Sequence, residues 1–409
     1  MRLMLAALAA IAAVAPFGPE FAPSIDHPAL EYSTRPTTDV VARLNADVRA
    51  GARQLDWDAA RGYLPATLEA LGVPPESQVL VFSKTSLQER RIGPDRPRAL
   101  YFSDQAAVAW VQRGALLEVA ASDPSQGVVF YGLAQRPAAV PQFTRREICL
   151  ECHVSDQTLG VPGFASGSLR VEADGTPAAS PQSVSVDHRT PLADRWGGWY
   201  VSGDVGGAAH RGVPLAADAP APFAREAYLR PTSDPVALLV LGHQSHLTNL
   251  LTRAGWELRV AEYEAVRAAA GFSGLAPPRA DAVRRIADEA AVEIVDYLLF
   301  VDEAPLPAPV TGDSGFARTF EAGGPRDRRG RSLRELDLHD RLLRYPCSYM
   351  VYSPAFAALP PAGAAAVRQR LRTVLEGRGG PRYLRLSAAD RQAVLEILTE
   401  TLRGFGGPG

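Results

Sequence analysis

The apolar residues of this 409-residue chain follow different periods in its two halves. Residues 37–55 place them three and four positions apart, which predicts a helix. Between residues 78 and 135, short runs rich in Val, Phe, Tyr and Leu are separated by Pro, Gly, Asp and Ser, and this pattern indicates an antiparallel sheet. We therefore expect a β-rich N-terminal domain.

From Ser233 onward the apolar period becomes helical. A helix is predicted to begin with the Ser-Asp-Pro sequence at 233–235, because Ser or Asp caps a helix and Pro suits its first turn. Residues 281–300 carry one apolar stripe, which predicts a helix with one buried face. Ser387, with Asp390 three positions later, marks the start of a further helix near the C-terminus.

The segment between these two parts has no regular period. Residues 143–232 are rich in Gly, Pro and Asp, and the two tryptophans and one tyrosine within 195–200 indicate an ordered stretch that wraps a functional site. The expected fold class is α+β. It comprises a β-rich N-terminal domain at 23–142, an irregular middle segment at 143–232 and a mainly α-helical C-terminal domain at 233–409.

The first residues read as a targeting segment. A single arginine precedes an apolar run that ends in Ala13-Val14-Ala15, which is typical of a signal peptide, and we assign residues 1–22 to signal peptide and leader. The run is shorter than the roughly 20 residues that span a bilayer. The expectation is a periplasmic or otherwise exported protein without stable membrane insertion after signal removal; the alternative is an uncleaved N-terminal anchor.

The charge balance narrows the class of partner. The formal net charge is −2, which argues against a nucleic-acid binder held by a broad basic surface. The local basic run at 326–334 has two interpretations, a docking site for an acidic redox partner or a solvated loop. Redox proteins and small electron donors or acceptors remain as partners.

Three cysteines occur in the chain, and two of them form a C-x-x-C-H sequence with the histidine that follows. Cys149 and Cys152 are three positions apart, so both sulfurs lie on one side of a helical turn and can reach the two vinyl groups of a haem. His153 then lies under the iron as its proximal ligand. A thiol redox site would not require this histidine, and a structural zinc site would need a second ligand pair. The pattern therefore favours covalent haem c, one per chain, in the middle segment.

The second axial ligand has to come from elsewhere. Met350 lies in an apolar run, where methionine usually serves packing. His243 lies on a predicted helix with leucines one turn away on either side, so it is our candidate for the distal iron ligand. His210 and an open sixth position are the alternatives.

Two arginines in the middle segment are candidates for binding a haem propionate. Arg189 and Arg195 carry the planar guanidinium fork that binds both oxygens of a carboxylate. The competing interpretation is an ion-pair network with Asp187 and Asp194, and such pairs are common.

A family resemblance supports the haem interpretation. From about residue 78 to residue 402 the chain resembles a group of exported bacterial proteins with one haem motif, on the segments CLECH, DHRTPLADRWGGWYVSG and YLLFVDEAPL. The closing helix at 387–402 is similar to that of small cytochromes c. The resemblance implies a cytochrome c-like protein and names no substrate. We expect electron transfer by a single haem; the alternatives are a haem enzyme, peroxidase-like or acting on a small molecule, and a haem-based sensor with an open sixth iron position.

Overall fold

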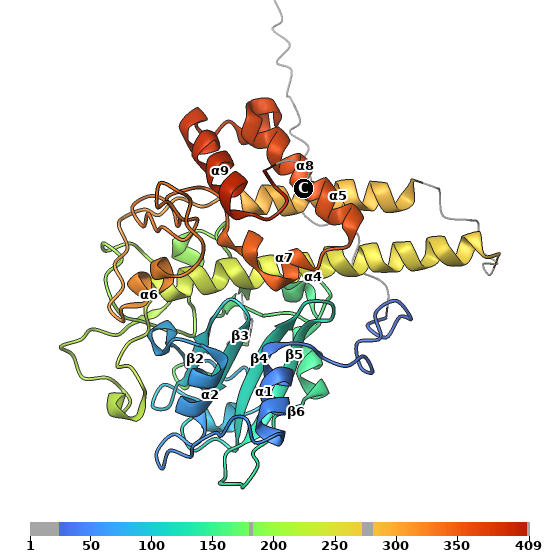
Figure 1. Ribbon diagram of the computed structural model, residues 1–409. Coiled ribbons are helices and arrows are strands. Elements are labelled where there is room, and N and C mark those ends of the chain that lie inside the picture. Colours follow the sequence, from blue (N-terminus) through green and yellow to red (C-terminus); the bar gives the residue numbers. More distant parts are fainter. Residues whose placement is uncertain (1–23, 180–182, 272–280, 407–409) are drawn as a thin grey trace, which may run out of the picture.

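The computed structural model describes residues 24–179, 183–271 and 281–406 (Figure 1). The expected signal peptide at 1–22 lies outside the described residues. Within the described ranges, no helix combines the length and the hydropathy that crossing a bilayer requires.

A six-stranded antiparallel sheet forms the base of the molecule. Its strands follow one another in chain order, so that each pairs with the next along the sequence. Within residues 78–135, where short apolar runs predicted strands, the structure places five of the six. The strands are β1 (Val79–Val81), β2 (Arg98–Phe102), β3 (Ala106–Trp110), β4 (Leu116–Asp123), β5 (Gly127–Ala134) and β6 (Thr144–Arg145).

One face of the sheet packs on two short N-terminal helices. These are α1 (Val40–Arg49), which falls within the predicted helix at 37–55, and α2 (Leu64–Leu71). Asp39 caps α1, since its Oδ1 accepts hydrogen bonds from the first backbone N–H groups, and its other oxygen accepts one from the Tyr131 hydroxyl at 2.6 Å. We call this face of the sheet, from which the side chains of Val108, Val119 and Tyr131 project, the inner face.

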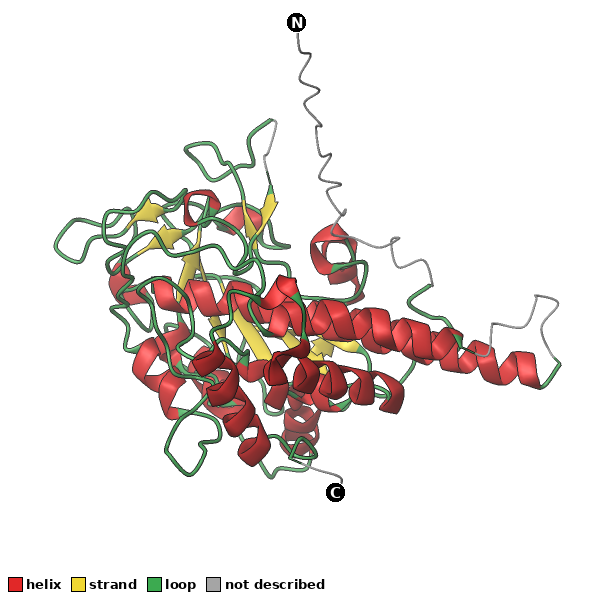
Figure 2. Cartoon of the chain, turned by 90° about the horizontal axis from the view of Figure 1, so that it is seen from above, coloured by secondary structure: helices red, strands yellow, loops and turns green. Residues whose placement is uncertain are grey.

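Two long helices cross the molecule above one end of the sheet, where the turns from β2 to β3 and from β4 to β5 lie. They are α4 (Pro235–Ala269) and α5 (Ala282–Leu298), which lie side by side and extend beyond the rest of the protein at one end (Figures 1 and 2). Asp234 caps α4 and Pro235 occupies its first turn, as the sequence predicts. The first half of α4 is buried all round because it lies between the sheet and the other helices. The remaining helices are α6 (Phe316–Ala322), α7 (Pro354–Ala357), α8 (Pro361–Thr373) and α9 (Ala388–Thr401).

The middle segment is mainly irregular, in agreement with its sequence. Among its described residues are α3 (Leu150–His153), which is one turn long, and two small strand pairs, β7 (Gly167–Ser168) with β8 (Val184–Ser185) and β9 (Tyr200–Val201) with β10 (Val213–Pro214). A bridge between Val81 and Trp199 joins this segment to the edge of the large sheet.

The prediction of a mixed α+β protein is confirmed, while the domain boundaries stay a prediction. Residues from both parts of the chain contribute to each of the two hydrophobic clusters. Val79 and Phe102 of the sheet belong to the cluster of the C-terminal helices, and Trp256 of α4 belongs to the cluster of the inner face.

Candidate functional site

The C-x-x-C-H sequence leaves the edge of the sheet as a helical turn. The Arg146 N–H, just after β6, donates to the Phe130 carbonyl of β5 at 2.8 Å, and the chain then turns into α3. Cys149 is half-buried and Cys152 is exposed, and both are free thiols. The helical backbone places the two sulfurs on one side of the turn, as their spacing implies.

One hydrogen bond determines which nitrogen of His153 carries the proton. Its Nδ1 lies 2.9 Å from the Gly163 carbonyl oxygen. A carbonyl can only accept, so Nδ1 is the donor, and Nε2 of the neutral ring keeps the lone pair that binds a metal. Burial lowers the pKa of His153, which favours this neutral, ligating form.

The loop that supplies this carbonyl is clamped by α4. The Asn249 side chain accepts from the Phe164 N–H at 2.9 Å and donates to the Phe164 carbonyl at 2.8 Å. Gly163 has no room for a side chain, since a Cβ there would lie 2.3 Å from the Asn249 Oδ1. Asn249 and Gly163 therefore position His153, although neither is marked by any pattern in the sequence.

The ring of His153 packs against the sheet. Its centroid lies 4.5 Å from that of Phe130, whose side chain projects from the face of β5 opposite to the inner face. Arg98 and Glu118, an ion pair at 3.5 Å, act electrostatically on the imidazole from the same region.

The environment of Cys149 does not favour thiol redox chemistry. Burial, together with the charge of Glu118, raises the pKa of the Cys149 thiol to about 11. A redox-active cysteine needs a lowered pKa, because the thiolate is the reactive form. A zinc site gains no support either, since the described residues contain no group of three or more His, Cys, Asp or Glu side chains able to hold a metal ion.

His243 was expected to face the iron as its distal ligand, but its ring nitrogens contact other protein groups. It lies fully buried in α4, with Nδ1 2.8 Å from the His188 Nδ1 and Nε2 2.7 Å from the Ser348 hydroxyl. Its ring stacks on Phe300 at 4.6 Å. Both ring nitrogens are hydrogen-bonded to protein groups, so this geometry lends no support to His243 as an iron ligand. The alternative His210 rests against Trp196 at 5.3 Å.

Arg189 and Arg195 belong to this same environment, which we call the buried histidine cluster (Asp187, His188, Arg189, Arg195, His243 and His246). Arg189 pairs with Asp187 at 2.6 Å, and its guanidinium also lies 3.1 Å from the His246 Nε2. Arg195 donates to the backbone carbonyls of Thr190 and His188. These contacts support the ion-pair interpretation for Arg189. None of them directs the side chain of Arg189 or Arg195 toward the C-x-x-C-H turn.

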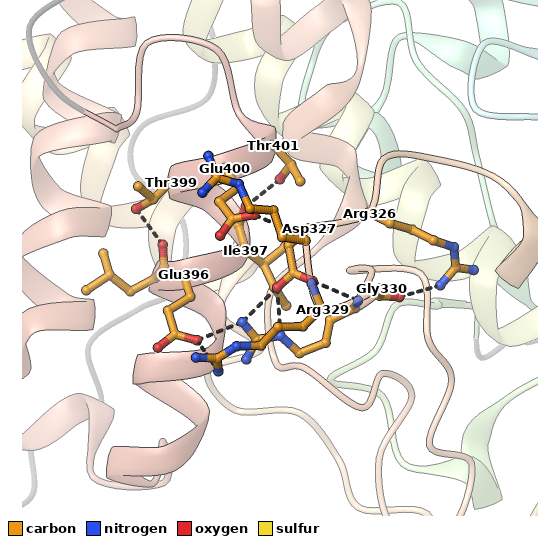
Figure 3. A network of polar contacts seen from close by, with 12 residues as sticks. Arg326, Asp327, Arg329, Gly330, Glu396, Ile397, Thr399, Glu400 and Thr401 are labelled. Carbon is orange, nitrogen blue, oxygen red and sulfur yellow. Dashed lines mark hydrogen bonds and ion pairs between the residues drawn. The ribbon is translucent and has the colours of Figure 1, made fainter.

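The basic run at 326–334 is paired with acidic residues of α9 (Figure 3). Arg329 contacts Glu396 at 2.9 Å, and Arg331 contacts both Asp327 and Glu396 at 2.7 Å. The Arg328 N–H donates to Glu400. These pairs fasten the loop to the C-terminal helix, which favours a structural role over docking of an acidic partner.

No protein-family model matches the chain, and neither a curated protein nor a solved structure matches it significantly. What the site binds therefore has to be inferred from its chemistry.

Proposed function

We propose that this protein carries one haem c, bound covalently through Cys149 and Cys152 with His153 as the proximal iron ligand, and that it transfers electrons in an exported compartment. The hydrogen bond from the His153 Nδ1 to the Gly163 carbonyl carries this proposal. It holds the imidazole in the tautomer that a proximal ligand needs, one residue after the second of two thiols on the same helical turn.

The residues around the motif fit a haem ligand. Phe130 packs on the imidazole and restricts its rotation, while Asn249 holds the loop that bears the accepting carbonyl. The exposed Cys152 leaves one edge of the site open to solvent. A bound haem supplies one-electron chemistry at its iron, and the chain orients and partly buries it.

One cavity of the described structure does not adjoin the motif and therefore offers no substrate pocket beside the iron. This cavity, of about 570 Å³, is lined by Lys84, Arg90 and Asp174 among others, and no residue of the C-x-x-C-H turn lines it. A haem enzyme would be expected to place its substrate pocket beside the iron.

Redox titration of the holoprotein tests the function. We expect one electron per chain to be taken up and released reversibly, and hydrogen peroxide with an organic electron donor to produce no turnover. Peroxide-dependent turnover would instead establish the enzyme alternative. Carbon monoxide binding to the reduced protein would establish an open sixth position, as the enzyme and sensor alternatives require.

A further inference from the structure

We infer that Arg98 binds a propionate of the haem, and that the face of the sheet opposite to the inner face, around Ala107, Ala109 and Ala120, is the wall against which the haem lies. This inference rests on the proposed haem attachment. It assigns haem contacts to a part of the chain that lies well before the C-x-x-C-H turn.

The pairing of the strands shows which residues lie beside His153 on this face of the sheet. Phe130, which contacts the His153 ring, pairs with Ala120 of β4, and Ala120 is followed in the same row by Ala107 of β3. Side chains of directly paired residues point to the same face of a sheet. The residues next to the imidazole on this face are therefore small.

The neighbouring row is less uniform, because it also contains Glu118, which pairs with Arg98. Gly132 of β5 pairs with Glu118 of β4, and Glu118 pairs with Ala109 of β3. The inner face of the same strands carries large side chains such as Trp110 and Tyr131. Ala120 is only partly buried, so it offers apolar surface to a flat hydrophobic group, whereas Ala107 also packs against the cluster of the C-terminal helices.

Arg98, which lies next to this face of the sheet through its ion pair with Glu118, has a hydrogen-bond donor, Nε, without a partner. Its side chain is only 16% exposed, and its Nη1 lies 3.5 Å from the Glu118 carboxylate. The Nε atom is buried and has no hydrogen-bond partner. A buried donor without a partner costs free energy, and a carboxylate is the acceptor that a guanidinium binds best. The propionates are the carboxylates that a haem would bring.

Arg146 is a weaker candidate than Arg98 although its Nε is also buried and unpartnered. Its aliphatic part lies over Gly132, and it is only three residues before Cys149. The cysteines attach to the vinyl edge of the porphyrin, which is remote from the propionates. Arg98 lies on β2, on the far side of β3 and β4 from the C-x-x-C-H turn.

Substitution of Arg98 in the full-length holoprotein tests the propionate contact. Arg98→Gln should retain covalent haem, shift the propionate bending band in the resonance Raman spectrum, and lower the reduction potential because a cation that disfavours the ferric state is removed. Arg98→Lys should keep the potential near that of the wild type, while the Raman band still shifts because the fork is lost. Arg331→Gln is the control, since Arg331 is 17% exposed and also pairs with carboxylates.

Substitution of Ala120 tests the wall. Ala120→Phe should reduce the haem content per chain several-fold, whereas Ala134→Phe, at an exposed position of β5, should not. If Ala120→Phe fails to fold, Ala120→Val applies the same test with less volume. Raman bands that are identical in Arg98→Gln and wild type, or full haem content with a bulky residue at 120, would overturn the inference. Wild-type protein without covalent haem would instead overturn the proposed function.

Discussion

The buried histidine cluster makes the stability of the protein depend on pH. Burial lowers the pKa of His243 to about 3 and that of His246 to about 4, from an ordinary value of 6.5. The pKa of His188 is also lowered by burial. We consider His246→Gln, because glutamine can still donate to Asp187 and accept from Arg189, the two groups that the imidazole contacts.

The sign of the effect follows from proton binding in the two states. Below pH 6.5 the unfolded chain protonates His246, whereas the folded protein keeps it neutral until the pH approaches 4. The free energy of unfolding therefore falls as the pH is lowered through this window. For one such histidine the linkage relation gives a loss of roughly 2 kcal/mol between pH 8 and pH 5. The pKa of Glu303, raised by burial to about 7, works in the opposite direction, but it is common to wild type and variant and cancels in their difference.

Urea unfolding at pH 8 and pH 5, followed by circular dichroism and tryptophan fluorescence, measures this difference. On acidification the wild type should lose about 2 kcal/mol more than His246→Gln. His339→Gln should follow the wild type, because His339 is exposed on a loop. If the wild type and His246→Gln lose equal stability, His246 is not held neutral by the fold and the reasoning is wrong.

Three further outcomes are expected. Cys149→Ser and Cys152→Ser should each lower the haem content per chain, measured by absorbance. Cys347→Ser should leave the haem content unchanged, because Cys347 is buried outside the motif. An equal loss of haem in all three variants would contradict the assignment of the two attachment cysteines. Gly163→Ala should lower the free energy of unfolding by about 1–3 kcal/mol in urea titrations, because its Cβ would clash with an α4 side chain, while Gly167→Ala, with ordinary contact distances, should be tolerated. The N-terminal sequence of the exported protein should begin after the predicted signal peptide, and a retained Met1 would mean an anchor.

Local features of the fold could be predicted from the sequence. Short apolar runs marked the strands, and the cap at Ser387 was visible because its side chain bonds the backbone only three residues later, at Asp390. The C-x-x-C-H residues were found for the same reason, since their chemistry is encoded in adjacent positions.

The features that were missed are contacts between distant segments. Asn249 of α4 binds the backbone of Phe164, which lies 85 residues earlier in the chain, and no short sequence pattern predicts such a pair. His243 shows most clearly what a sequence pattern cannot predict. The leucines of its helix predicted that its side chain is buried, which is confirmed. Burial alone does not reveal which groups bind the ring nitrogens. Its partners, His188 and Ser348, come from distant parts of the chain and occupy both nitrogens.

Intact mass spectrometry of protein matured in cells that attach c-type haem decides whether the proposed haem is covalently bound. We expect a mass equal to the processed chain plus one haem, and colour that stays with the protein through extraction with acidified acetone. A mass equal to the chain alone, or haem that passes into the acetone, would contradict it.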